Sequence, residues 1–389
     1  MRLLFIADFS EQFPNRVLRG IRKYSQEAPE PWVVCKMPTS YMETNGFNAV
    51  LSWARSWRAN VVLATFRPEH PVEEFRKNGI AAVAMDYIQP FCQIPNLTGE
   101  DHRIGEMVAR DFVSNGFRYF AYFGYHGICW SDARRRGFMD YLDAQGLKDN
   151  FQEGIRVHTA TLWSYDESKL GSWLQSLPKP VGIMACDDNQ ANILLECCRT
   201  FDIRVPAEVA VIGVDNDEML CTMTDPQISS VNVDLEGGGY SFAVMAERMV
   251  KDPGYMGEDI ILHPIGIVYR NSSGVVVTGD KSVQEAIRFI SENAHKKIKV
   301  RDVLEHVPMS RRSLEQRFLK ATGMSVYQFI TKIRMELFAQ MLLTSDDTVS
   351  MIAAKMDEPD SKSISRRFAS ITGYTPTEYK RKFLRKMRE

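Results

Sequence analysis

Apolar and polar residues alternate along the first 270 positions in a pattern that predicts strands followed by amphipathic helices. Leu3–Ala7 is a short apolar run, and Val17, Leu18, Ile21 and Tyr24 follow it at helical spacing. The same succession recurs at Val61–Ala64 with Val72–Phe75, Ala81–Met85 with Ile104–Phe112, Tyr119–Gly124 with Arg136–Ala144, Val181–Cys186 with Asn189–Phe201, and Val209–Val214 before a loop. Strands that read as continuous apolar runs are buried on both faces, so we expect parallel sheets with helices on both sides.

The number of predicted strands is too large for one small sheet. A chain of 389 residues also exceeds one ordinary domain. We therefore expect residues 1–270 to form an α/β unit with two lobes of similar plan and a cleft between them, in which a ligand would bind at the carboxyl ends of the strands.

The last quarter of the chain repeats itself with a period of 50 residues. Leu314 aligns with Ile364, Arg317 with Arg367, and Phe318 with Phe368, while Thr322-Gly323 aligns with Thr372-Gly373. Each copy reads as a short helix, a tight turn and a second helix with a basic, hydroxyl-rich face. This unit places one helix in a DNA major groove, so we predict two helix-turn-helix units at about 300–320 and 349–370.

Charge is divided unevenly along the chain. Residues 281–389 carry 22 Lys and Arg against 13 Asp and Glu, whereas residues 1–280 carry 26 against 36, and the formal net charge is -1. Lys and Arg displace counterions condensed on phosphate, so the basic tail fits a double-stranded DNA partner and the acidic body does not. Charge alone would also fit a solvated helical face, and the repeat is what favours DNA.

Polar side chains suited to a sugar follow the predicted strands. Carboxylates, an amide, a guanidinium and an indole can pair with hydroxyls and pack on the apolar face of a sugar ring. The candidate ligand-binding residues are Asp8, Trp130, Arg134, Asp187, Asp215 and Asn216. Each aspartate could instead cap the next helix, Asp187 above all, and Trp130 could belong to the core.

Other chemistries find little support in the sequence. There is no phosphate-binding glycine motif, and Gly237-Gly238-Gly239 is expected to form a loop entering a helix at Tyr240–Val250. The seven cysteines include no C-x-x-C pair, so neither a zinc site nor a disulfide framework is expected, and we expect no cofactor. The apolar stretch at the N-terminus is five residues long, too short for a signal-peptide core, so we expect a cytoplasmic protein without membrane association.

Residues 282–384 resemble the tandem helix-turn-helix domain of the AraC/XylS family of transcription regulators. The resemblance is carried by Ser310, Leu314, Phe318, Gly323, Arg334, Leu342-Leu343, Ile352-Ala353, Ile364, Phe368, and Gly373-Tyr374-Thr375-Pro376-Thr377-Glu378-Tyr379. Residues 1–270 resemble the sugar-binding domain of LacI/GalR-type regulators, which has a periplasmic-binding-protein-like fold. That likeness lies in Arg134-x-x-Gly137-Phe138, in Val205-Pro206 before Val209-Ala210-Val211-Ile212-Gly213, and in Asp215-Asn216.

The combination implies a sugar sensor at 1–270, a linker at 271–281 with a hinge beginning at Asn271-Ser272-Ser273-Gly274, and a DNA-binding domain at 282–389. It further implies a homodimer that responds to a small sugar, D-xylose first of all, with RNA polymerase as a candidate partner. The family's pattern places Arg311, Arg312, Glu315, Gln316, Ser361, Lys362, Ser365 and Arg366 toward DNA. Arg, Lys, Gln and Glu side chains can read base edges, whereas phosphate contacts add affinity without choosing sequence.

Two departures from the family pattern affect the second unit. Asp357-Glu358, followed by Pro359, stands where the family has a glycine and an aromatic residue. A left-handed turn there would be strained without glycine, although Asp tolerates it better than most residues, and two acidic side chains near phosphate would weaken DNA contacts. Phe338 also stands where a small residue is expected in the connecting helix.

The alternatives come from other functional classes. One alternative is a sugar-converting or nucleotide-using enzyme with a basic appendage. Against it, the seven His of the chain are not spaced as metal ligands, and no nucleophile stands in a G-x-S-x-G turn. A periplasmic solute-binding protein would share the body's architecture, but it would need an export signal and no repeat. A sensor of a sugar other than xylose stays open, because hydroxyl geometry is not read from spacing along a chain.

Overall fold

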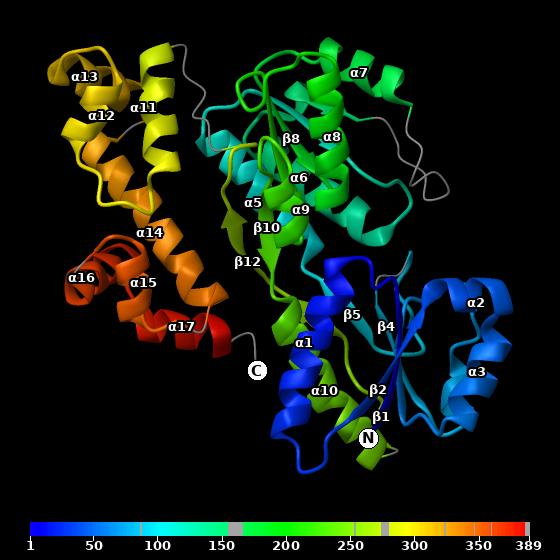
Figure 1. Ribbon diagram of the computed structural model, residues 1–389. Coiled ribbons are helices and arrows are strands. Elements are labelled where there is room, and N and C mark those ends of the chain that lie inside the picture. The colour runs from blue at the N-terminus through cyan, green and yellow to red at the C-terminus, as the bar shows by residue number, and fades with distance from the viewer. Residues whose placement is uncertain are drawn as a thin grey trace.

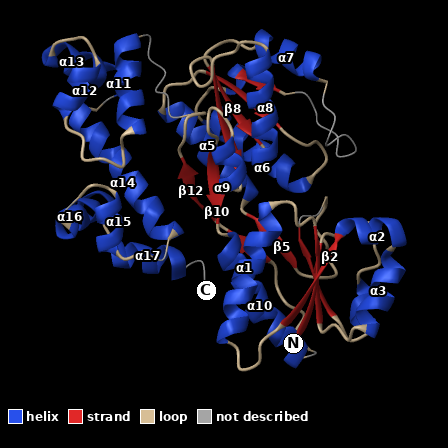
Figure 2. Ribbon diagram, in the orientation of Figure 1, coloured by secondary structure: helices blue, strands red, loops and turns tan. Residues whose placement is uncertain are grey.

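The computed structural model describes residues 1–85, 88–154, 166–252, 254–273, 280–322, 324–345, 347–358 and 360–385. Two α/β lobes are followed by a wholly helical region, as predicted (Figure 1). In both lobes a parallel arrangement of strands is flanked by helices on both faces (Figure 2).

The first lobe contains a six-stranded sheet in the order β11-β5-β4-β3-β1-β2, all parallel. Its strands are β1 (Arg2–Ala7), β2 (Val33–Pro38), β3 (Val61–Ala64), β4 (Ala81–Met85), β5 (Asn96–Gly99) and β11 (Ile260–Leu262). One face is covered by α1 (Gln12–Glu27) and α10 (Leu235–Lys251), the other by α2 (Thr39–Asn45), α3 (Phe47–Ser56) and α4 (Glu73–Lys77). The central strands are fully buried, which is why they read as unbroken apolar runs.

The second lobe repeats this plan with the order β12-β10-β9-β8-β6-β7; of the strands in its described part, only the edge strand β12 is antiparallel. Its strands are β6 (Tyr119–Phe123), β7 (Phe151–Glu153), β8 (Val181–Ala185), β9 (Val209–Val214), β10 (Ser229–Val233) and β12 (Pro264–Val268). Helices α5 (Asp101–Ser114) and α6 (Cys129–Ala144) cover one face. The other face carries α7 (Glu167–Ser176), α8 (Asp188–Thr200) and α9 (Glu218–Met223).

The chain passes between the lobes at three places: between β5 and α5, between β10 and α10, and between β11 and β12. His263, in the third crossing, lies 3.0 Å from Glu100 in the first. The peptide N–H of Asp234, in the second, donates to the carbonyl of His263. The three crossings are thus tied to one another at the base of the cleft.

A close helix pair in each lobe depends on glycine. A Cβ on Gly20 of α1 would lie 1.9 Å from the carbonyl oxygen of Glu236, and one on Gly239 of α10 would lie 2.0 Å from that of Val17. The corresponding pair in the second lobe, α5 and α6, meets at Gly105 and Gly137. The prediction of a glycine loop before Tyr240 is therefore wrong: Gly237, Gly238 and Gly239 lie inside α10, and the close approach of α1 requires Gly239.

The helical region consists of α11 (Lys281–Glu292), α12 (Val300–His306), α13 (Arg311–Thr322), α14 (Val326–Thr344), α15 (Val349–Lys355), α16 (Ser361–Thr372) and α17 (Pro376–Arg385). It contains two helix-turn-helix units, α12–α13 and α15–α16, called here the first and second reading units. Helix α14 runs from one to the other (Figure 1).

The 50-residue repeat extends to individual contacts. Phe318 packs edge-on against Phe329 with ring centroids 5.3 Å apart, and Phe368 packs against Tyr379 in the same way at 5.0 Å. The hydroxyl of Thr322 donates to the carbonyl of Phe318 at 2.8 Å, and that of Thr372 to the carbonyl of Phe368 at 2.9 Å. Leu314 and Ile364 are both fully buried. Gly373 has φ 75 as a C-cap, whereas its counterpart Gly323 lies outside the described residues.

The two departures in the second unit are accommodated. Asp357 adopts φ 53, the left-handed conformation expected of the glycine it replaces. Glu358 is 3% exposed and turns inward, so the expectation that both acidic side chains would lie near phosphate is wrong for Glu358. Phe338 is fully buried and packs against Phe368 at 5.1 Å.

The predicted hinge at 271–274 differs from the structure at its start. The Ser272 hydroxyl donates to the carbonyl of Val211 and accepts from the peptide N–H of Ser229, and Ser272 and Ser273 are buried. These residues belong to the second lobe, and residues 274–279 lie outside the described ranges. Among the described helices, none has the length and apolar character needed to cross a bilayer.

Candidate ligand pocket and nucleic-acid interface

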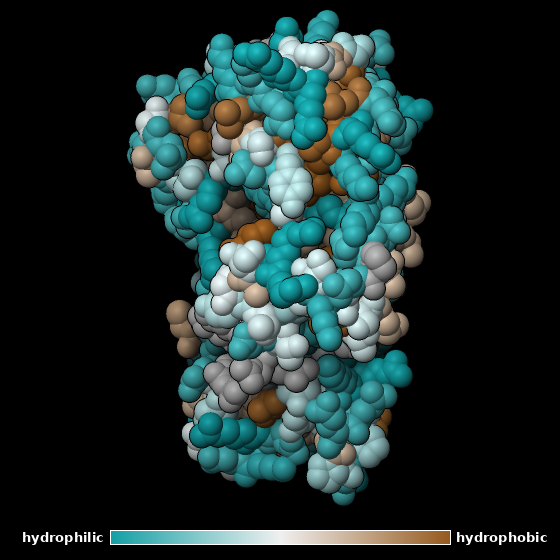
Figure 3. Space-filling view, turned by 90° about the vertical axis from the view of Figure 1, so that its left-hand side faces the viewer, coloured by the Kyte–Doolittle hydropathy of each residue, from teal (hydrophilic) through white to brown (hydrophobic). Residues whose placement is uncertain are grey.

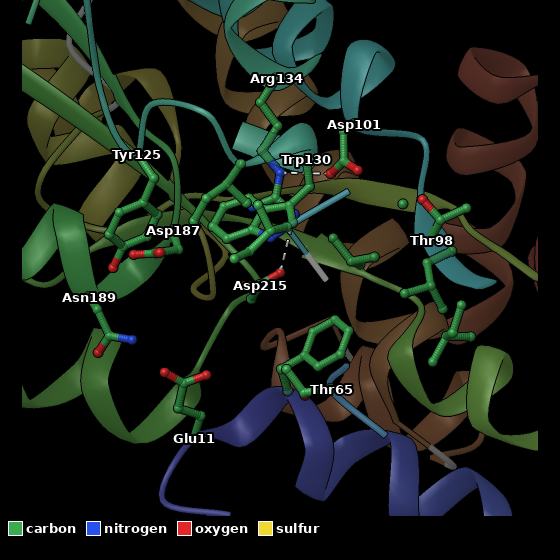
Figure 4. Close-up of a pocket in the computed structure, with 17 residues that line it drawn as sticks. Glu11, Thr65, Thr98, Asp101, Tyr125, Trp130, Arg134, Asp187, Asn189 and Asp215 are labelled. Atoms are coloured by element: carbon green, nitrogen blue, oxygen red, sulfur yellow. Dashed lines mark hydrogen bonds and ion pairs between the residues drawn. The ribbon is translucent and has the colours of Figure 1, made fainter. Parts of the chain in front are cut away.

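A cavity of about 310 Å³ lies between the two lobes. The first lobe contributes Glu11, Phe13, Thr65 and Thr98, and the second contributes Asp101, Tyr125, Trp130, Arg134, Asp187, Asn189 and Asp215. Figure 4 shows Arg134 and Asp101 on one side of the cavity and Glu11 with Thr65 on the opposite side. The volume falls at the lower end of the range for small-molecule sites.

Arg134 is the centre of the polar lining and is 7% exposed. Its Nε donates to Asp101 Oδ1 at 2.8 Å, its Nη1 donates to the carbonyl of Cys186 at 2.5 Å, and its Nη2 lies 3.8 Å from Asp215 Oδ1. Its Cζ lies 4.9 Å from the ring centroid of Trp130. Burial alone would lower the pKa of Arg134, but the carboxylates of Asp101 and Asp215 raise it, so the guanidinium stays charged.

Asp215 lines the cavity and lies beside Arg134. It follows β9 with φ 96, a left-handed conformation, and its peptide carbonyl accepts from Arg16 Nη1 at 2.6 Å. Burial raises the pKa of Asp215, and the nearby Arg134 opposes this. Its buried Oδ1 has no hydrogen-bond partner among the described residues. A buried polar atom without a partner costs free energy that a ligand hydroxyl would relieve.

Asp187 has both of the roles weighed from sequence. Its Oδ1 accepts from the peptide N–H of Gln190 at 2.7 Å, which caps α8, and its side chain also lines the cavity. Burial raises the pKa of Asp187 to about 6. Beside it, the hydroxyl oxygen of Tyr125 accepts from Gln190 Nε2 at 2.9 Å, which leaves the hydroxyl proton free to be donated.

Two predicted ligand residues lie outside the cavity lining. Asp8 is exposed, and its carboxylate accepts from the peptide N–H and the hydroxyl of Ser10, so it closes its own turn. Asn216, with φ 51, accepts at Oδ1 from Arg270 Nη2 at 2.8 Å. The structure thus brings Trp130, Arg134, Asp187 and Asp215 together and does not support Asp8 or Asn216 as direct contacts.

Sequence reasoning missed several residues of the pocket. Thr65 directly follows the predicted strand β3, so the rule that found the aspartates would have found it too. Thr98 and Asp101 flank the end of β5, a strand that the apolar pattern did not predict. Arg16 does not line the cavity but was also missed, because it lies within α1; its guanidinium reaches the second lobe, where it donates to the carbonyls of Asp215 and Val233.

The first reading unit presents Arg311, Arg312 and Gln316 to solvent from α13. Glu315 has a different role from the predicted base contact. Its Oε2 accepts from the peptide N–H of Val326 at 3.2 Å, in the first turn of α14. The carboxylate is used within the protein.

The second reading unit presents Ser361, Lys362, Ser365 and Arg366 around one open surface depression on α16. Lys362 and Arg366 are exposed, and the Ser365 hydroxyl donates to the carbonyl of Ser361 at 2.6 Å. Helices α13 and α16 lie on the same side of the molecule (Figure 1). Figure 3, which views that side, shows a mostly hydrophilic surface. Such a face suits the phosphate backbone and base edges of DNA.

Comparison with known proteins divides the chain in the same way. Residues 109–273 match the family model of a periplasmic binding protein-like domain, and residues 303–382 match that of a helix-turn-helix domain. A xylose operon regulatory protein of Haemophilus influenzae is 26% identical over 385 residues, which cover 97% of each chain.

Solved structures with a similar fold include regulators and sugar-binding domains. One is described as a xylose-binding transcription activator; it is 21% identical, covers 97% of each chain and superposes with a TM-score of 0.59. Another is a periplasmic binding protein/LacI transcriptional regulator from Alkaliphilus metalliredigens in complex with D-xylulofuranose. It is 18% identical, with a TM-score of 0.56, and covers 70% of this chain and 99% of its own. The predicted combination of domains is confirmed, and the three proteins named here are described as regulators of transcription or of an operon.

Proposed function

The chain is a transcription regulator in which a periplasmic-binding-protein-like domain precedes an AraC-type helix-turn-helix domain, and we propose that a small sugar, D-xylose first, binds between the lobes. DNA is read by the two units of the tail. The regulator acts in the cytoplasm as a homodimer, and RNA polymerase is a candidate partner at the promoter.

The observation that carries the sugar proposal is the Asp215 carboxylate at the cavity wall, whose Oδ1 lies 3.8 Å from Arg134 Nη2 but makes no hydrogen bond among the described residues. Sugar hydroxyls both donate and accept, so one ring can satisfy a carboxylate and a guanidinium at once. The Trp130 indole and Phe13 supply apolar surface for the ring face. Xylose is placed first because a full-length relative and a full-length structural neighbour are described by it.

Helix α5 offers a physical route from the cavity to the tail. Asp101 at its start pairs with Arg134 in the cavity. Asp111, about 15 Å further along the helix, accepts from the hydroxyl of Tyr269 at 2.5 Å. Burial raises the pKa of Asp111 to about 6, with Tyr269 and Lys332 on α14 acting in the opposite direction. A shift of α5 on lobe closure would therefore be felt by the helix that joins the two reading units.

The route fits a two-state mechanism. Arg16 holds the first lobe to the carbonyls of Asp215 and Val233 in the second lobe, so closure around a sugar and the position of Asp215 are coupled. A ligand shifts such an equilibrium only by its difference in affinity for the two arrangements. In a dimer, that shift changes the spacing of the tails and with it the fit to DNA.

Thermal unfolding across a panel of pentoses and hexoses tests the effector. D-xylose should raise the melting temperature more than the other sugars, because selective binding to the folded state stabilises it. Asp215→Asn tests the pocket more specifically than Asp215→Ala would, because Asn tolerates the left-handed conformation of this residue and Ala does not. Replacing a charged acceptor by a neutral one should weaken sugar binding about tenfold while DNA binding persists.

Asp202→Asn is the matched control, since Asp202 is exposed and also has a left-handed φ of 53. Sugar affinity in Asp215→Asn equal to that in Asp202→Asn would contradict the pocket assignment. Stabilisation by another sugar and not by xylose would keep the pocket and replace the effector.

A further inference from the structure

The two reading units have separate hydrophobic cores that share only helix α14. Leu314 and Phe318 of the first unit pack with Phe329, near the start of α14. Ile364 and Phe368 of the second unit pack with Phe338, near its end. Between the two cores, α14 carries Arg334, which is 3% exposed.

An ion cluster lies at this boundary, buried at Arg334 and Glu358 and open to solvent at Lys297. Glu358 Oε1 accepts from Lys297 Nζ at 2.7 Å, and Glu358 Oε2 lies 3.7 Å from Arg334 Nη2. Arg334 also donates from Nη1 to the carbonyl of Ala294 at 3.1 Å and from Nη2 to that of Met356 at 3.0 Å. One guanidinium therefore holds a carbonyl from each side of the boundary.

The members of the cluster come from different units. Lys297 lies between α11 and α12, ahead of the first reading unit, and Glu358 lies in the turn of the second. The peptide N–H of Lys297 also donates to Asp357 Oδ2 at 3.4 Å. Glu358 occupies the position where the AraC-type pattern has an aromatic residue, so an apolar contact has been exchanged for an ionic one.

Such an exchange is not explained by stability. Desolvation of a buried ion pair offsets much of its Coulomb attraction, and an apolar replacement is often as stable or more so. A buried ion pair does fix the relative orientation of the segments that it joins, because its geometry is set by a few atoms. The cluster connects the units away from the axis of α14, where it resists bending and twisting of that helix.

We propose that Lys297, Arg334 and Glu358 fix the second reading unit relative to the first, so that α13 and α16 enter successive turns of the major groove together. Those turns are about 34 Å apart, and a single helix of about 27 Å joins the units. When two binding modules are held in register, the second binds at high effective concentration, and loosening them reduces the joint affinity without changing either contact surface. Glu358 is thus a positioning residue for DNA reading, whatever the effector.

The competing explanation is that Lys297, whose side chain is 46% exposed, contacts a DNA phosphate directly. The two explanations differ for Glu358→Gln. Removing a negative charge near DNA would strengthen binding by long-range electrostatics, whereas loosening the cluster would weaken it.

The test uses the full chain and a duplex that the wild-type protein recovers from a random-sequence pool, together with two versions in which one half is scrambled. Glu358→Gln and Lys297→Met should each weaken binding to the intact duplex about tenfold and change binding to the half-scrambled duplexes less than about twofold. Lys297→Arg, which keeps the positive charge, should bind the intact duplex tightly. Lys296→Met is the control, because Lys296 is the exposed neighbour that bonds only locally, to Asn293.

Equal or tighter binding of the intact duplex by Glu358→Gln would overturn the proposal. The proposal would also be overturned if Lys297→Met lost the same affinity for all three duplexes and its salt dependence fell by about one counterion. That result would mark a direct contact of Lys297 with a phosphate. Retained binding to the duplex that keeps only the first half shows that the tail of each variant is folded.

Discussion

Tyr269→Phe tests whether the sugar signal passes through the side chains where α5 faces the tail, since Asp111 of α5 and Tyr269, just after β12, lie near Lys332 of α14. The mutation removes one hydroxyl, which donates to Asp111 at 2.5 Å, and leaves the ring in place. A hydrogen bond to a carboxylate contributes about 1.5–3 kcal/mol. Tyr269 is 39% exposed, and solvent screening reduces this to about 1 kcal/mol.

About 1 kcal/mol corresponds to roughly a fivefold change in an equilibrium constant. The assay is the affinity of the full chain for its selected duplex with and without xylose. In Tyr269→Phe, the ratio of the two affinities should fall about fivefold relative to wild type. Linkage requires that the effect of DNA on sugar affinity fall by the same factor, which provides an internal check.

Tyr327→Phe is the matched control, because Tyr327 is an exposed tyrosine on α14, at 60%. It should leave the ratio unchanged. Asp111→Asn should behave like Tyr269→Phe, since it weakens the same bond from the other side. A ratio in Tyr269→Phe within twofold of wild type, in protein that binds sugar and DNA normally, would refute this route for the signal.

Further predictions concern packing, pH and base reading. Gly239→Ala should lower the free energy of unfolding in urea by about 1–3 kcal/mol, because its new methyl would lie 2.0 Å from the carbonyl oxygen of Val17; unchanged stability would contradict the packing of α1 on α10. Burial raises the pKa of Asp188 to about 8. The neutral carboxyl therefore stabilises the fold fully below about pH 4, and this contribution is lost as the pH rises through about 8. Asp188→Asn should flatten the pH dependence of the free energy of unfolding over this range, and an unaltered slope would contradict the burial of this carboxyl. Arg312→Ala should relax base preference at one position of the selected duplex by about 1–3 kcal/mol, whereas Glu315→Ala should lower thermal stability with the preference retained; selection from a random pool separates the two outcomes.

Sequence patterns predicted the tail in most detail. Many contacts in the tail join residues close together in the sequence, so Phe318 and Phe368, 50 residues apart, each pack against the aromatic residue eleven positions later. The role of Glu315 could not be predicted from the sequence, because the hydrogen bond that its carboxylate accepts depends on where the first turn of α14 packs. Glu358 was expected near phosphate because a turn is normally exposed, and only Lys297 and Arg334, distant in sequence, explain its burial.

The pocket was predicted only in part for a related reason. Residues that directly follow long apolar strands, such as Asp187 and Asp215, were found by the strand rule. Thr98 lies within β5, a short strand with little apolar character, and Tyr125 lines the cavity from a loop. Asp8 satisfied the strand rule and still turned away, because Ser10 provides a local partner for its carboxylate. Gly239 was misplaced because the helix that it packs against, α1, lies more than 200 residues earlier.

The most direct test is equilibrium binding of the full chain to the selected duplex over a range of salt concentrations, with and without D-xylose. We predict tight binding that weakens steeply with salt and shifts severalfold when xylose is added. Absence of binding to any duplex in dilute buffer, or binding that no pentose alters, would contradict a sugar-controlled reader of DNA.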